Sequence, residues 1–181
     1  MSCTEVRASR KNGVRMAKRK PDPKAKALAT PTNRDGACID KLMQLGSNVA
    51  TLDSAEKRAA QKLLNYDGEI YPSDGCAITL STLLQDAGID VPDIYTAIEL
   101  GAELRDKRNW QVVDVGHQQQ GDVGSTCGLK PHHGFDHIYL MLRKLNDDEM
   151  LIADNQSSQP HFRWASGLGG KTPTTFFLRA T

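Results

Sequence analysis

Apolar residues recur at helical spacing through the first 104 residues of the chain. Residues such as Leu80 and Leu83 lie three positions apart and are followed by further apolar positions, as on the buried face of an amphipathic helix. Asp53 followed by Glu56 matches a capping box, and Gly46 matches a C-terminal cap. The pattern predicts four helices, over residues 37–45, 53–65, 76–87 and 93–104.

From residue 110 onward the pattern changes to that of strands. Residues 110–115, 137–142, 150–154 and 174–179 are rich in β-branched, aromatic and aliphatic side chains. Four polar residues at 146–149 predict a hairpin turn between two of these runs, and residues 116–134 predict a long loop that borders a site. Helices first and strands later predict an α+β fold, with N-terminal helices packed on a small antiparallel sheet.

Length and charge suggest one folded domain with a basic arm. The chain has 181 residues, of which 39% are hydrophobic, which suits a single core. Nine Lys and Arg against two acidic residues give residues 1–26 a net charge of +7, so the remainder carries −6 of the total +1. We expect a disordered arm over residues 1–34 and a folded domain over residues 35–181. An anionic partner for the arm is an alternative, and Met16 is an alternative start.

The chain lacks the sequence signals of export and of a membrane span. The first 30 residues contain no apolar segment of about 7–15 residues, and no run of about 18 apolar residues occurs. We expect a cytoplasmic monomer with no membrane span, with non-classical export as the alternative. The four cysteines contain no close pair and are expected to be reduced, although an exported chain could form a Cys38–Cys127 disulfide.

Cys76 stands where a turn-forming segment, residues 71–75, meets the third predicted helix. A thiol attacks as the thiolate, and the unpaired N–H groups at a helix N-terminus lower its pKa. His137 follows 61 residues later, at the start of a predicted strand. This layout predicts a Cys/His hydrolase with Cys76 as its nucleophile.

A Cys/His pair also requires a third group that fixes the tautomer and orientation of the imidazole. The strand that pairs with the His137 strand ends in three polar residues, Asp154, Asn155 and Gln156. Pairing of Leu145 with Met150 would put Asp154 and Gln156 on the face of His137. A tighter turn would bring Asn155 to that face instead, because a shift of one residue reverses every side chain.

These residues resemble the NlpC-like and CHAP branch of the papain-like cell-wall hydrolases. The resemblance spans residues 66–156. It implies a papain-like fold with Cys76 as nucleophile, His137 as general base and then acid, Asp154 as the orienting group and Tyr66 as an oxyanion donor. It is carried by Tyr66, Asp74-Gly75-Cys76-Ala77, Gln120-Gly121-Asp122-Val123, Asp136-His137-Ile138-Tyr139-Leu140-Met141-Leu142 and Ile152-Ala153-Asp154-Asn155-Gln156.

The reaction that the resemblance implies is hydrolysis of an amide through an acyl-enzyme, with peptide bonds of peptidoglycan fragments as the usual substrates. Gln156 and His133 are expected to contact the substrate. Two alternatives stay open. One is an acyl-transferring or deamidating enzyme with the same Cys/His pair, and the other is an inactive domain whose basic arm binds a partner.

The remaining Cys, His and Arg residues give weaker indications of function than Cys76 and His137. Cys127, His132, His133 and His137 are zinc ligands by residue type, but their spacing matches no standard finger, and we expect neither a metal nor another cofactor. His161 is expected at the surface. Arg163 with the following tryptophan could bind a carboxylate and a flat apolar group, although a core position for the tryptophan is favoured.

Overall fold

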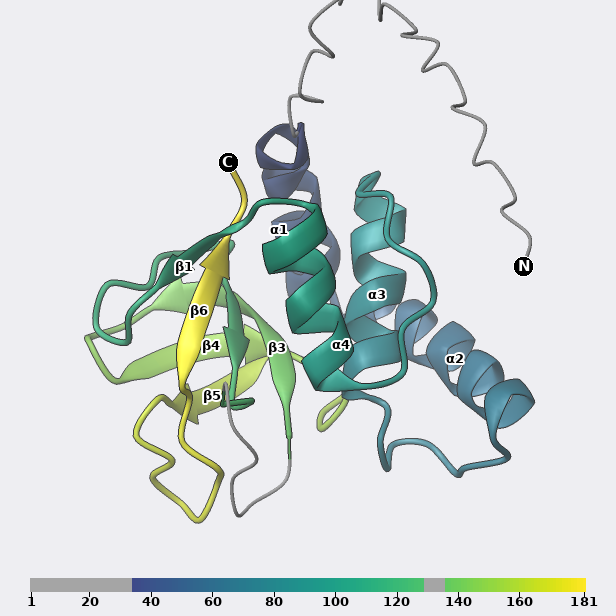
Figure 1. The fold of residues 1–181 in the computed structure, drawn as a ribbon. Coiled ribbons are helices and arrows are strands. Elements are labelled where there is room, and N and C mark those ends of the chain that lie inside the picture. The colour runs from purple at the N-terminus through teal and green to yellow at the C-terminus, as the bar shows by residue number, and fades with distance from the viewer. Residues whose placement is uncertain (1–33, 129–135) are drawn as a thin grey trace, which may run out of the picture. The chain divides into compact units, whose positions relative to one another are not determined.

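The computed structural model describes residues 34–128 and 136–181 (Figure 1). Contacts divide the chain into residues 1–32 and residues 33–181. The predicted basic arm lies outside the described residues apart from Arg34, as do His132 and His133. No helix in the described ranges is long and apolar enough to cross a membrane.

The described residues form an α+β fold with four α-helices and a six-stranded antiparallel sheet, so the predicted α+β class is confirmed. All strand pairs in the sheet are antiparallel, in the order β1-β6-β2-β3-β4-β5. The elements are η1 (Asp35–Cys38), α1 (Ile39–Ser47), α2 (Val49–Tyr66), α3 (Cys76–Ala87), α4 (Ala97–Ala102), the π-helical turn η2 (Glu103–Lys107), β1 (Gln111–Val113), β2 (Val123–Ser125), β3 (Ile138–Lys144), β4 (Glu149–Ala153), β5 (His161–Trp164) and β6 (Phe176–Arg179).

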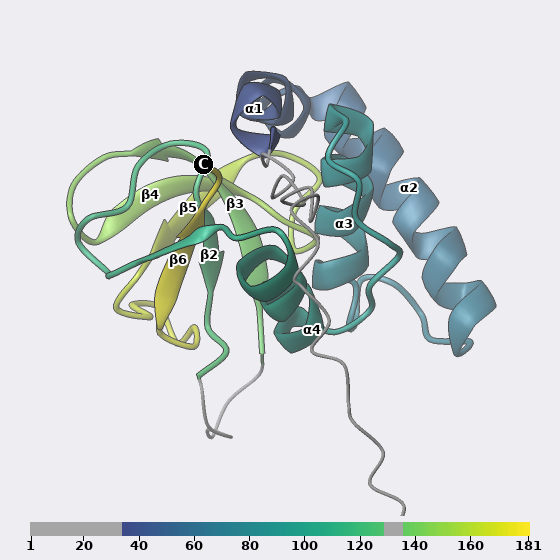
Figure 2. The same cartoon turned by 45° about the horizontal axis from the view of Figure 1, so that its top comes forward.

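Helix α3 is the centre of the helical layer. It contacts α1, α2, α4 and strand β3, and Figures 1 and 2 show α2 on the side of α3 that faces away from the sheet. Its polar residues Thr79, Ser81 and Thr82 are buried as well, and the Thr82 hydroxyl donates to the carbonyl of Ile78 at 2.8 Å. Because α3 is enclosed in this way, its first residue, Cys76, has a defined position against the sheet.

The first two helices differ from the prediction at their ends. Helix α2 begins at Val49 and not at Asp53, because the Asn48 side chain accepts from two backbone N–H groups of its first turn. Gly46 lies inside α1 and does not end it. A Cβ at Gly46 would lie 2.8 Å from the Leu140 side chain, so this glycine allows α1 to approach β3.

Helix α4 begins later than predicted and ends in a different geometry. Thr96 caps it by accepting from the backbone N–H of Glu99, so the helix starts at Ala97. Asp93, the predicted start, instead pairs with Lys62 of α2 at 2.6 Å. The predicted helix over residues 93–104 is therefore an α-helix over residues 97–102 only, and its last two residues belong to the π-helical turn.

Two strands, β2 and β5, were not predicted. Strand β2 has three residues and lies within the segment predicted as a long loop. Its Gly124 faces Tyr139 of β3, whose ring would lie 2.2 Å from a Cβ at that position. Strand β5 has four residues with two polar side chains, His161 and Arg163, so its hydrophobic pattern is weak.

Apolar side chains of the sheet form separate clusters on its two sides. Ile138 and Leu140 pack with the helices, whereas Tyr139, Met141 and Ile152 pack with residues of the other side. Successive residues of β3 thus point to opposite faces, and both faces are buried.

Candidate active site

A cleft of about 570 Å³ lies where the N-terminus of α3 meets the ends of β3 and β4. Cys76 is the first residue of α3, and His137 directly precedes β3. The structure therefore brings these two predicted residues to the wall of one cavity, although 61 positions separate them. The cleft is lined by Pro72, Ser73, Asp74, Cys76, Asp136, His137, Asn155, Gln156 and Lys171.

The segment before Cys76 is tied to the end of β4. The Asn155 side-chain amide donates to the carbonyl of Pro72 at 2.6 Å, and the backbone N–H of Gly75 donates to the same carbonyl at 3.1 Å. A Cβ at Gly75 would lie 2.6 Å from the Tyr71 ring. These contacts position the start of α3 relative to the sheet, and they give Asn155 a structural role instead of contact with the imidazole.

His137 and Asp154 form a buried pair. The Nε2–H of His137 donates to Oδ2 of Asp154 at 2.8 Å, and Asp154 is 3% exposed. The Oδ1 atom of Asp154 accepts from Nε2 of His161 at 2.9 Å and from the backbone N–H of Gln156 at 2.8 Å. Of the three alternatives for the orienting group, Asp154 is the one beside the imidazole, and Nδ1 is the nitrogen left for a thiol.

Burial alone would raise the pKa of the Asp154 carboxyl. The hydrogen bonds and positive charge supplied by His137 and His161 outweigh that effect and hold its pKa well below the usual range. Asp154 is therefore a carboxylate at neutral pH. Its charge in turn raises the pKa of His161.

A β-bulge decides that Asp154 shares the face of His137. Near the turn Met150 pairs with Lys144 and not with Leu145, the first of the two alternatives, whereas beyond the bulge Met141 pairs with Ile152. The extra residue in β3 changes the parity of the pairing. Without the extra residue, the register found at the turn would continue along both strands. It would then place Asn155 on the His137 face and turn the carboxylate of Asp154 toward the helices.

The thiol of Cys76 is not activated by its helix in the way predicted. Burial raises its pKa to about 11. The backbone N–H groups of Ile138 and Ala77 lower it, as expected at a helix N-terminus, but they do not offset the loss of hydration. The backbone N–H of Ala77 at the start of α3 thus lowers the thiol pKa, but burial has the larger effect.

No hydrogen bond joins Cys76 to His137 among the described residues, and the bond of the imidazole goes to Asp154. The sulfur nevertheless lies close to the start of β3, since the backbone N–H of Ile138, the residue after His137, stabilises its thiolate. Cys76 and the imidazole of His137 line the same cleft.

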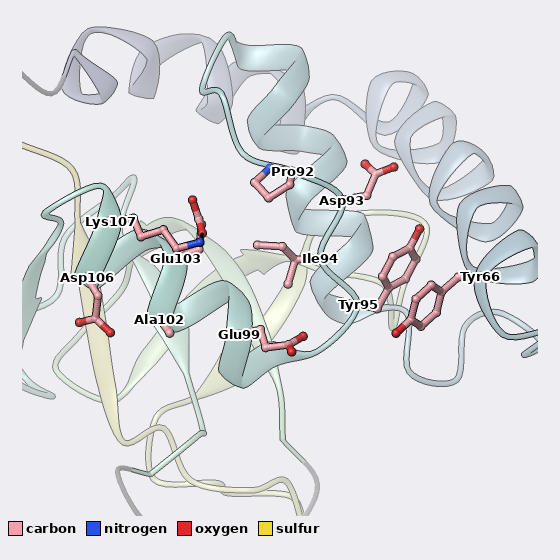
Figure 3. Close-up of a pocket in the computed structure, with 10 residues that line it drawn as sticks. All are labelled: Tyr66, Pro92, Asp93, Ile94, Tyr95, Glu99, Ala102, Glu103, Asp106 and Lys107. Atoms are coloured by element: carbon pink, nitrogen blue, oxygen red, sulfur yellow. Dashed lines mark ion pairs between the residues drawn. The ribbon is translucent and has the colours of Figure 1, made fainter. Parts of the chain in front are cut away.

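Tyr66, the predicted oxyanion donor, lies in a different place. It is 63% exposed at the end of α2 and stacks on Tyr95, with ring centroids 3.8 Å apart. Figure 3 shows both rings in a second cleft, beside Asp93 and Glu99. The assignment of Tyr66 to the active cleft is corrected, because the segment after α2 continues for nine residues before it reaches Cys76.

Tyr71 is the tyrosine near the thiol. Its hydroxyl lies 3.4 Å from that of Thr79 in α3. Burial raises the pKa of Tyr71, and the charges of Glu56, Asp154 and Cys76 add to the rise. Tyr71 is therefore a neutral hydrogen-bond donor in the physiological range.

Of the two predicted substrate contacts, Gln156 lines the cleft, where its side-chain oxygen accepts from Nζ of Lys171 at 3.0 Å. His133 lies outside the described residues, together with His132. Within the described ranges no group of three His, Cys, Asp or Glu could hold a metal ion. The described cysteines are free thiols: Cys38, Cys76 and Cys127.

His161 was expected at the surface, but it is half-buried and bonds to Asp154. It opens β5 and pairs with Ile152 of β4, which places it on the face of His137. A strand prediction over residues 161–164 would have located it, and the polar composition of that segment concealed the strand.

Comparisons with models of protein families, with curated proteins and with solved structures found no match for this chain.

Proposed function

We propose that this chain is a cysteine-dependent amide or peptide hydrolase with a papain-like domain of the NlpC/CHAP type. In this proposal Cys76 is the nucleophile, His137 is the general base and then acid, and Asp154 orients the imidazole. The observation that carries the proposal is the buried His137–Asp154 pair at 2.8 Å, on the wall of the cleft that also holds the first residue of α3.

The chemistry follows from this arrangement. Nδ1 of His137 takes the thiol proton, and the thiolate of Cys76 attacks the amide carbonyl carbon. Backbone N–H groups at the start of α3 stabilise the oxyanion. The imidazolium then gives its proton to the leaving nitrogen, the C–N bond breaks, and an acyl-thioester remains. Water, deprotonated by His137, attacks the thioester and releases a carboxylate and the free thiol.

Asp154 has two roles in this scheme. Its hydrogen bond keeps the proton on Nε2 of His137, which leaves Nδ1 as the base, and its charge stabilises the imidazolium. Its bond to His161 holds the carboxylate in place. His161 acts through Asp154 and is therefore a positioning residue.

The papain-like assignment is supported by the order of elements around the cleft. A nucleophile opens a central helix, the base precedes the strand that this helix contacts, and the acid follows the adjacent antiparallel strand. We extend the proposal to peptidoglycan stem peptides and related amides as substrates, which is the class implied by the sequence resemblance.

One observation favours a second candidate, an inactive domain. Burial raises the pKa of Cys76 to about 11, so without an imidazolium partner the thiolate is scarce at neutral pH. The two candidates differ in one measurable property, because only a hydrolase needs His137 to activate Cys76.

Mass spectrometry of muropeptides tests the proposal. Incubation with the wild-type protein is expected to release products shortened at a peptide bond, whereas a Cys76→Ala variant should release none. The positions of the new amines would identify the bond. Equal product patterns with the two proteins would refute hydrolysis of this substrate class, and release of ammonia without chain cleavage would identify a deamidase.

A further inference from the structure

A second cavity of about 260 Å³ adjoins the active cleft. It shares Asp136, His137, Gln156 and Lys171 with that cleft, and Arg163 of β5 is part of its wall. The proposed hydrolysis accounts for the first cavity and leaves the second without a role. The two cavities are therefore neighbours, and the His137 side chain lines both of them.

Arg163 is a buried cation without a counterion. It is 3% exposed, and among the described residues no acidic side chain forms an ion pair with it. One Nη atom donates to the carbonyl of Thr172 at 2.7 Å, and the guanidinium lies 4.9 Å from the centre of the Tyr139 ring. Its Nε–H is buried and has no acceptor within the described residues.

Buried charges in proteins are usually paired, because the loss of hydration is costly. The ring of Tyr139 compensates for only part of that cost. Lys171 adds a second positive charge at the rim, against the single negative charge of Asp136. The cavity therefore favours an anion, and a guanidinium favours a planar carboxylate that accepts two hydrogen bonds.

We propose that this second cavity is a carboxylate subsite in which Arg163 and Lys171 bind the leaving-group side of the substrate. The second cavity borders His137 but not Cys76, and His137 is the group that protonates the leaving nitrogen. This inference rests on the proposed hydrolase function. The substrate class it names is a peptide or amide whose leaving amine belongs to a residue with a free carboxylate.

A binding experiment tests the subsite without catalysis. The ¹⁵N–¹H resonance of Arg163 Nε in the full-length protein is followed while N-acetylglycine is added, with N-acetylglycinamide as the uncharged control. The carboxylate should shift this resonance in a saturable way in both the wild type and Cys76→Ala, and the carboxamide should not. No shift, or the same shift with both compounds, would overturn the subsite.

A kinetic experiment tests its role in substrate choice. A stem peptide with a C-terminal carboxylate on its leaving residue is compared with the same peptide as the carboxamide. The wild type should prefer the carboxylate by about 10- to 100-fold in kcat/KM, the range expected for hydrogen bonds to a charged group. Arg163→Gln should bring the ratio close to one, and exposed Lys171→Gln should reduce it by a smaller factor.

Arg143→Gln is the matched control, since Arg143 is exposed on β3 and lines neither cavity. It should keep the wild-type ratio. Equal turnover of the two peptides by the wild type would refute the subsite and leave the hydrolase proposal standing. A carboxylate-specific shift of Arg163 without hydrolysis of any peptide would refute the hydrolase, and with it the leaving-group role, while still showing that Arg163 binds a carboxylate.

Discussion

Replacement of His137 by alanine should slow alkylation of Cys76 at pH 7 by about 100-fold. The reason is electrostatic. Burial raises the pKa of this thiol to about 11, and the imidazolium of His137 is the one group proposed to lower it. Without that charge the thiol should return to the value that its buried position imposes.

The magnitude follows from two opposing effects. A cysteine activated by a neighbouring imidazolium has a pKa of about 7 or below, so about half of it is thiolate at pH 7, against about one part in 10,000 for a pKa of about 11. The more basic thiolate is also the better nucleophile, by roughly 60-fold for a Brønsted slope of about 0.45. The ratio of the two effects leaves a decrease of about 100-fold.

The assay is the rate of iodoacetamide labelling between pH 5 and pH 10, followed by peptide mapping so that each cysteine is measured separately. His117→Ala is the control, since His117 is exposed and lies outside the cleft. A labelling rate of Cys76 that is unaffected by His137→Ala would refute activation by the imidazole.

Three further predictions concern stability. Asp154→Asn should lower the free energy of unfolding by about 2 kcal/mol at pH 7 and by less at pH 3, as urea titrations can measure, because the stabilisation from the lowered pKa of Asp154 is complete above the carboxyl's unfolded pKa of about 4 and is lost progressively as pH falls toward its folded pKa. A difference that is equal at both pH values would contradict this. Glu56→Gln should raise the free energy of unfolding by about 1 kcal/mol at pH 8 and leave it unchanged at pH 4. Burial raises the pKa of Glu56 to about 7, so the stabilisation from its protonated carboxyl is lost as pH rises through that value. A lower melting temperature of the variant at pH 8 would count against this prediction. Gly124→Ala should cost about 1–3 kcal/mol, because a Cβ would overlap the Tyr139 ring, and an unchanged melting temperature would show that the ring can move aside.

The elements that carry the candidate chemistry were predictable from local pattern. The apolar spacing after Cys76 and the continuous apolar run after His137 each specify one element, and burial of both fixes how α3 lies against β3. Local pattern therefore predicted the helix that begins at Cys76 and the strand that follows His137. The distance between their side chains depends on tertiary packing, which spacing along the chain does not report.

The register of the hairpin was left open by the sequence, and Asp154 was assigned from the family resemblance. The observed turn pairs Lys144 with Met150, and a bulge in β3 then brings Asp154 to the face of His137. A bulge leaves little trace in a hydrophobic pattern, because the residue it adds is itself apolar. The face on which Asp154 lies could therefore not be predicted from the hydrophobic pattern alone.

The positions of Tyr66 and Arg163 were not predicted from the sequence. Tyr66 was assigned by its distance along the chain from Cys76, but the path of the intervening segment carries it to Tyr95. Arg163 was considered only as part of a pair with the following tryptophan. Its position near His137 depends on β5 pairing with β4, and a strand of four residues with two polar side chains has no clear period.

The central claim is that Cys76 forms an acyl-enzyme with the help of His137. The most direct measurement is acid-quench mass spectrometry after mixing the protein with p-nitrophenyl acetate, with peptide mapping of the acetyl group over time. The account predicts an acetyl group on Cys76 that forms at neutral pH and is then lost, and that forms far more slowly in His137→Ala. Acetylation of Cys38 at the same rate as Cys76, or a Cys76 rate independent of His137, would contradict it.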